Sequence, residues 1–225
     1  MCGRFTLRTP APKLIEIFQV DAIPKLSPRF NIAPTQLILG IRAAESGSER
    51  DALMMRWGLI PFWAKDQSIG NRLINARSET VAEKPSFRNA FKKRRCLIVA
   101  DGFYEWQKLE DGKQPHLIQM PDAEPFAIAG LWESWRDKSQ GDDAKEVTSC
   151  TLLTTSANQE MQALHDRMPV ILDPADWATW LSPESSVAQR QALLKPMSDG
   201  SLEHFPVSKV VNRPINDTPE CIQPV

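Results

Sequence analysis

Apolar residues change their spacing several times along the chain, and this predicts many short strands with a few helices between them. After Thr9-Pro10 the apolar positions recur at helical spacing, whereas between residues 52 and 58 they alternate with polar ones, as in a strand. Further strands are predicted at 36–43, 96–100, 104–108, 115–120, 126–132 and 147–155. Further helices are predicted at 79–93 (interrupted at Pro85), 157–164, 174–181 and 185–194.

This mixture predicts an α+β fold rather than an alternating series of strands and helices. Prolines punctuate the run 28–34, which we expect to be irregular, and a turn is expected at 45–49. The chain has no internal repeat and no low-complexity linker. We therefore expect a single domain, residues 1–225, with short helices flanking mostly antiparallel strands.

Composition excludes several classes of protein. With 225 residues, 42% hydrophobic and 24% charged, the chain is typical of a globular protein and unlike a coiled coil, collagen or a disordered tail. No stretch approaches the roughly 20 apolar residues that span a bilayer, and the N-terminus lacks the apolar core of a signal peptide. We therefore expect a cytoplasmic protein with no membrane partner.

The four cysteines, Cys2, Cys96, Cys150 and Cys221, are far apart and have no zinc-binding spacing. In a reducing compartment they are expected to be free thiols. We accordingly predict no metal and no other cofactor.

Charge is distributed unevenly along the chain. Residues 1–100 carry 17 Lys and Arg against 8 Asp and Glu, whereas residues 101–225 carry 10 against 20. The segment 71–100 is the most basic. This asymmetry permits a local basic face that binds a polyanion, although a solvated helix face explains it equally well.

Cys2 is the first residue with potential chemistry. If Met1 is removed, Cys2 carries both an α-amine and a thiol, whose reference pKa values of about 7.7–8.0 and 8.5 leave both partly nucleophilic near neutral pH. Such an aminothiol condenses with an aldehyde to an imine that closes to a thiazolidine, or acts as an N-terminal nucleophile in amide hydrolysis. The alternative is that Cys2 is incidental.

Three further polar elements are candidates. Asn75 and Arg77 lie in a polar run that is expected to begin a helix. The planar guanidinium group of Arg77 is suited to bind a phosphate. Glu105 lies between aromatic residues in a predicted strand, where it is either buried, with a raised pKa suited to acid–base chemistry, or turned to solvent. His165 lies beside an acid and a guanidinium and is a natural proton shuttle. Each has a structural alternative when taken alone: an asparagine cap, a solvated carboxylate and a packing histidine.

Aromatic residues and prolines accompany the basic elements, notably Pro34 and the segment from Trp57 to Trp63. Exposed rings next to Arg and Lys can stack on bases of an unpaired strand. Burial is the commoner use of tryptophan, and Trp57 is expected in the core.

Together these elements resemble the SOS-response-associated peptidase (SRAP) family of abasic-site processing proteins. The motifs that carry the resemblance are Met1-Cys2-Gly3-Arg4-Phe5, Arg29-Phe30-Asn31-Ile32-Ala33-Pro34, Trp57-Gly58, Asn75-Ala76-Arg77-Ser78-Glu79-Thr80, Asp101-Gly102-Phe103-Tyr104-Glu105-Trp106, His165-Asp166-Arg167-Met168-Pro169 and Pro206-Val207-Ser208. They run from the first residue almost to the last, so the resemblance covers essentially the whole chain.

The resemblance implies a β-barrel-like core and a protein that binds single-stranded DNA and reacts covalently with the aldehyde of an abasic site. It implies that Cys2 is the nucleophile, that Glu105 deprotonates its amine, that His165 shuttles a proton to the opening sugar and that Asn75 positions these groups. The residues implied to hold flanking phosphates or bases are Arg4, Arg77, Arg167, Pro34 and Trp63. We further expect a monomer.

Two other functions remain open. One is a thiol peptidase that acts on other substrates, in which Cys2, Glu105 and His165 form a hydrolytic set. Both activities hold together if the only peptide cut is the protein's own removal of Met1. The other is a non-catalytic module that binds single strands and leaves Cys2 idle. Only the crosslinking protein and the peptidase require a free Cys2 terminus.

Overall fold

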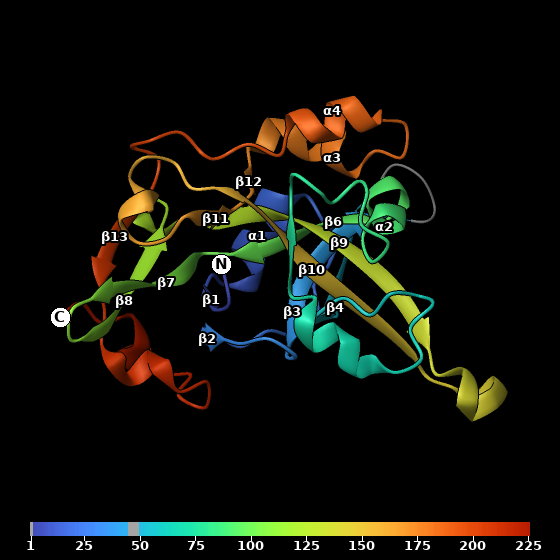
Figure 1. Ribbon diagram of the computed structural model, residues 1–225, viewed down its shortest axis with the longest axis horizontal. Helices are drawn as coiled ribbons and strands as arrows, with labels where there is room; N and C mark the ends of the chain where they lie inside the picture. Colours follow the sequence, from blue (N-terminus) through green and yellow to red (C-terminus); the bar gives the residue numbers. More distant parts are fainter. Residues whose placement is uncertain (1, 45–49) are drawn as a thin grey trace.

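Strands dominate the structure, a computed structural model that describes residues 2–44 and 50–225 (Figure 1). The turn expected at 45–49 lies outside the described residues. The strands are β1 (Phe5–Leu7), β2 (Arg29–Ile32), β3 (Leu37–Ala43), β4 (Arg50–Trp57), β5 (Asn75–Arg77), β6 (Arg95–Ala100), β7 (Gly102–Leu109), β8 (Gly112–Gln119), β9 (Phe126–Arg136), β10 (Glu146–Ser156), β11 (Arg167–Pro169), β12 (Ile171–Leu172) and β13 (Glu203–Pro206). The α-helices are α1 (Ala11–Phe18), α2 (Arg88–Lys93), α3 (Trp177–Leu181) and α4 (Val187–Ala192).

Five strands close into a barrel. Strand β10 pairs with β4 on one side and with β9 on the other, and the ring is completed through β3 and β6. Only the β10–β4 pairing in this ring is parallel. Closure leaves these strands without free edges, and β6 is buried along its whole length. The predicted β-barrel-like core is therefore confirmed.

A second sheet packs against the barrel and carries the N-terminus. Its strand order is β13-β8-β7-β1-β2, and its pairings are antiparallel. Phe5 of this sheet contacts Trp57 of the barrel with 5.1 Å between ring centroids, and both side chains are fully buried. One hydrophobic core thus contains residues of both sheets. The predicted α+β class is confirmed, and a single domain over residues 1–225 stays a prediction.

The short helices cover the outside of the sheets (Figure 1). Helix α1 begins directly after Pro10, whose fixed φ suits the start of a helix, and ends at Gln19 in the left-handed conformation. Its last residue, Phe18, stacks on Trp177 at the start of α3, with ring centroids 4.6 Å apart. Among the described residues, none of these helices has the length and apolar character to cross a membrane.

Several expected elements differ from the structure. The helix predicted at 79–93 is present only as α2, because the segment before it forms turns around Pro85, which has no backbone N–H to donate. The helix predicted at 157–164 is reduced to a single 3-10 turn, Met161–Ala163. The run 28–34, expected to be irregular, contains β2, whose backbone pairs with β1.

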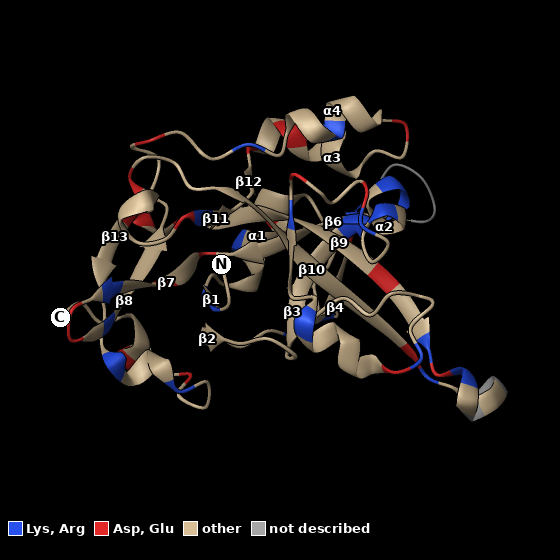
Figure 2. Ribbon diagram, viewed as in Figure 1, with Lys and Arg blue, Asp and Glu red and all other residues tan. Residues whose placement is uncertain are grey.

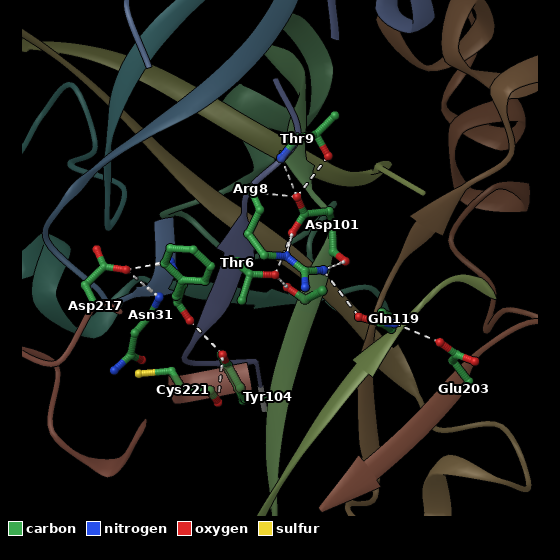
Figure 3. A network of polar contacts seen from close by, with 12 residues as sticks. Thr6, Arg8, Thr9, Asn31, Asp101, Tyr104, Gln119, Glu203, Asp217 and Cys221 are labelled. Atoms are coloured by element: carbon green, nitrogen blue, oxygen red, sulfur yellow. Dashed lines mark hydrogen bonds and ion pairs between the residues drawn. The ribbon is translucent and has the colours of Figure 1, made fainter. Parts of the chain in front are cut away.

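A buried carboxylate fastens the N-terminal strand to the rest of the second sheet (Figure 3). Asp101 is 1% exposed, and its two oxygens accept hydrogen bonds from Thr6, Arg8 and Thr9. Asp217 binds the backbone N–H groups of Phe30 and Asn31 in a similar way. These contacts fix β1 and β2, and with them the position of the residues that precede β1.

Candidate active site

Cys2 lies in the interior, beside β7. The backbone N–H of Tyr104 donates to the carbonyl of Arg4 at 3.0 Å, which continues the pairing of β1 with β7 back toward the N-terminus. The Cys2 side chain has no exposed surface. Burial raises the pKa of its thiol to about 12, and the negative charge of Glu105 adds to this effect. The thiol is therefore neutral at physiological pH.

The side chain of Asn75 binds the backbone of Cys2. Its Nδ2 donates to the Cys2 carbonyl oxygen at 2.7 Å. Asn75 belongs to β5, which pairs in parallel with β10, so the expectation that it opens a helix was wrong. Its Oδ1 is buried and accepts no hydrogen bond from any described residue. An unsatisfied buried acceptor of this kind is costly, and it suits a donor that arrives with the substrate or with a new N-terminus.

Glu105 is buried, which decides between the two alternatives left open by the sequence. It is 3% exposed on β7, next to the strand segment that leads to Cys2. Burial is the largest cause of the raised pKa of its carboxyl group. Glu105 lies close enough to interact electrostatically with both the Cys2 thiol and the His165 side chain. A carboxyl group with a raised pKa is suited to take up and return a proton near neutral pH.

His165 is more exposed than Cys2 and Glu105. Its Nδ1 is 3.0 Å from the backbone N–H of Arg167, which donates to it, and 2.7 Å from a carboxylate oxygen of Asp166. The first contact requires a lone pair on Nδ1, whereas the second requires a proton there, so the tautomer of the ring decides which of the two is made.

The three arginines expected to hold phosphates differ in their availability. Arg4 donates to Asn31 Oδ1 at 2.7 Å and to the Val211 carbonyl at 3.0 Å, so it is a structural link within the fold. Arg167 forms a two-pronged ion pair with Glu79. Arg77 is exposed and has no ion-pair partner among the described residues. Of the three, Arg77 is the one whose guanidinium is open to a ligand.

The two residues expected to contact bases lie on the surface. Pro34 is half-buried and precedes Thr35, whose φ of 73° marks a tight turn. Trp63 is 46% exposed. It borders a cavity of about 340 Å³ that is lined by Phe62, Trp63, Pro85, Arg88, Asn89 and Lys92.

The basic segment 71–100 is less available than its sequence indicates. Figure 2 shows Lys and Arg gathered on α2 and at the start of β6. However, Arg94 pairs with Glu133 at 2.6 Å, and Arg95 is 4% exposed and donates to the carbonyls that end two helices. Part of the positive charge is therefore used to cap backbone carbonyls rather than to form a binding face.

The sequence analysis missed the ion pair between Glu79 and Arg167. It also did not show which motif residues stabilise the fold. Glu79 and Arg167 are 88 positions apart, and nothing in a single sequence links them. Asn31 and Tyr104 belong to matched motifs, yet both are fixed by hydrogen bonds within the fold, with Tyr104 Oη donating to the Phe30 carbonyl at 2.6 Å (Figure 3). Within the described residues no group of three or more His, Cys, Asp or Glu side chains is arranged to hold a metal ion.

Comparison with known proteins gives a consistent picture. The chain is 42% identical to the abasic site processing protein YoqW of Bacillus subtilis, with 99% of both chains covered. It is 32% identical to the abasic site processing protein HMCES of Xenopus tropicalis, over 88% of this chain and 66% of that protein. The crystal structure of a Bacteroides thetaiotaomicron protein, 26% identical, superposes over both whole chains with a TM-score of 0.87.

The family described as SOS response associated peptidase (SRAP) matches residues 1–214. Together with the relatives named abasic site processing proteins, this match shows the family directly. The chain belongs to the SRAP family.

Proposed function

We propose that this protein crosslinks itself to abasic sites in single-stranded DNA through a thiazolidine on Cys2. The observation that supports it best is that Asn75 donates to the Cys2 carbonyl at 2.7 Å, beside the buried Glu105, whose charge interacts with both Cys2 and His165. Relatives that cover the whole chain are named abasic site processing proteins. An abasic deoxyribose supplies the aldehyde that an aminothiol consumes.

The reaction follows from the protonation states of these groups. His165 gives a proton to the ring oxygen of the deoxyribose as the C1′–O4′ bond breaks, and the C1′ hydroxyl loses its proton to water to leave the aldehyde. Glu105 takes a proton from the α-ammonium of Cys2, and the free amine adds to the aldehyde and loses one water to form an imine. The thiol then adds to the imine carbon, its proton moves to the imine nitrogen, and the ring closes.

This order suits a neutral thiol. Because the pKa of Cys2 is raised to about 12, the thiolate is scarce, and the amine rather than the sulfur is the first nucleophile. The thiol needs to lose its proton only when the imine beside it accepts one. The buried Oδ1 of Asn75 is available to accept a hydrogen bond from the α-ammonium and orient it.

The mechanism requires removal of Met1. A thiazolidine contains the nitrogen and the sulfur of the same cysteine, so the amine of Cys2 cannot be part of a peptide bond. In the SRAP family name, "peptidase" then refers to this single cut, and Cys2, Glu105 and His165 are the groups that perform it on the chain itself.

DNA binding is assigned to two arginines and to two residues at the surface. Arg77 and Arg167 hold phosphates, and Pro34 and Trp63 contact bases next to the lesion, because an exposed ring stacks on any unpaired base. Arg4 keeps the N-terminal segment in place through Asn31 and Val211. Binding in this way weakens as salt rises, since neutralised phosphates release counterions.

A denaturing gel with a single-stranded oligonucleotide carrying one abasic site tests the proposal. We expect a band of protein joined to DNA that forms without reductant and is absent with undamaged DNA. Cys2→Ser should abolish the stable band and leave binding to single strands nearly intact. Cleavage of unrelated peptides without any DNA adduct would instead favour a general thiol peptidase, and binding without either reaction a non-catalytic module.

A further inference from the structure

The carboxylate of Glu79 binds the guanidinium group of Arg167. One carboxylate oxygen accepts from Nη1 at 2.5 Å and the other from Nη2 at 3.0 Å. The same Nη2 also donates to the Thr154 carbonyl at 2.6 Å, so Arg167 is held against β10. Arg167 is mostly buried, whereas Glu79 is half exposed. The carboxylate therefore closes the outward side of the arginine.

This pair lies at the candidate active site. The backbone N–H of Arg167 donates to Nδ1 of His165. Thr154 of β10 is in register with Arg77 of β5, two residues before Glu79, and Ser156 is in register with Arg167 of β11. Arg77 and Arg167 thus belong to the two strands that pair with the end of β10, and Glu79 follows the first of them.

A carboxylate and a phosphate present the same feature to arginine, namely two oxygens that accept parallel N–H groups. Glu79 is ionised at neutral pH, because the hydrogen bond from Arg167 lowers the pKa of its carboxyl group. The Glu79 side chain is half exposed, so a phosphate can approach Arg167 from the same side and replace Glu79 as its anionic partner.

We propose that the Glu79 carboxylate is a built-in substitute for a DNA phosphate, which occupies Arg167 in the free protein and is displaced when a strand binds. This inference rests on the proposed function, because it takes Arg167 to be a phosphate ligand. Glu79 and DNA then compete for Arg167. Because every strand that reaches Arg167 must first displace Glu79, undamaged DNA binds more weakly.

The test compares Glu79→Gln with Glu83→Gln, which removes the same charge from an exposed position without an ion pair among the described residues. Binding of an undamaged single-stranded oligonucleotide is measured at low salt. We expect Glu79→Gln to bind about two- to fivefold more tightly than wild type, and Glu83→Gln to match wild type. Glu79→Asp, which is too short to keep both contacts, should bind with intermediate affinity and serves if the amide variant folds poorly.

The gain must depend on the arginine. In an Arg167→Ala background, Glu79→Gln should change affinity no more than Glu83→Gln does. Unchanged or weaker binding by both Glu79 variants would overturn the inference, because a positioning role for Glu79 predicts a loss. If wild type binds no single-stranded DNA at all, the proposed function fails; if it binds and Arg167→Ala weakens it while Glu79→Gln gives no gain, only this inference fails.

Discussion

The Nδ2 group of Asn75 donates to the carbonyl oxygen of Cys2 at 2.7 Å, and this bond ties the start of the chain to a strand 73 residues further along. Because β5 is itself held on β10, the N-terminal cysteine is attached to the wall of the barrel. The flexibility expected of a chain end is thereby removed at the residue that we propose as the nucleophile.

Asn75→Ala should slow crosslinking without weakening the binding of DNA. The variant loses one hydrogen bond to the backbone of Cys2, whose net contribution is about 1 kcal/mol, so the rate should fall by roughly fivefold. Crosslinking rates at saturating abasic oligonucleotide, with binding measured on undamaged DNA, check this. Equal losses in rate and in affinity would place Asn75 in DNA recognition instead.

Glu105→Gln should slow crosslinking by about 10²–10⁴-fold, because an amide cannot take a proton from the α-ammonium. In wild type the rate should rise with pH as Glu105 ionises, at a pH above the ordinary range of a glutamate because burial raises the pKa of its carboxyl group. A pH–rate profile of both proteins measures this. Persistence of the same acidic limb in Glu105→Gln would assign it to another group.

The same substitution should stabilise the protein at neutral pH. Because the folded-state pKa of Glu105 is raised, folding favours its protonated form, and its contribution to stability is lost as pH rises through that pKa. Glu105→Gln removes this loss. Thermal unfolding should show a higher Tm than wild type at pH 7 and no difference at a pH below the unfolded-state pKa.

His165→Ala should slow crosslinking by about 10²–10⁴-fold and leave affinity for undamaged DNA unchanged. The proton that opens the sugar ring must also return when a crosslink reverses, so reversal should slow as well. Quenched-flow sampling of adduct formation and of adduct decay measures both directions. Rates within about threefold of wild type in both directions would remove His165 from proton transfer.

Glu105 and Asn75 show which features of the site the sequence predicts and which it does not. The alternation of apolar residues predicts the strand that carries Glu105, but only the tertiary structure decides which face of that strand is buried. Asn75 was expected at a helix start, because its local sequence contains polar capping residues. Pairing with β10 overrode that preference, and such long-range pairing leaves no local signal.

The matched motifs contain both residues that we propose for the reaction and residues that support the fold. Asp101 stands four positions before Glu105 in the same motif, yet it binds Thr6, Arg8 and Thr9 rather than the reacting groups. The cause is geometric: Asp101 lies at the corner between β6 and β7, where the backbone N–H groups that follow β1 need an acceptor. A single sequence cannot separate these two roles.

Asp101→Asn should therefore test stability rather than chemistry. The amide cannot accept all the hydrogen bonds made by the carboxylate and leaves Arg8 without its buried partner, at a cost of about 3 kcal/mol. Thermal unfolding should show a lower Tm, while crosslinking well below that temperature stays close to wild type. A large loss of rate in the folded variant would show that Asp101 takes part in the reaction.

The mass of the crosslinked protein tests the central claim most directly. Intact-mass and fragment-ion analysis of the adduct with an abasic oligonucleotide should show a chain that lacks Met1, joined to the DNA with loss of one water, with the attachment at Cys2. An adduct of the same stability on a chain that retains Met1, or on another residue, would contradict the thiazolidine mechanism.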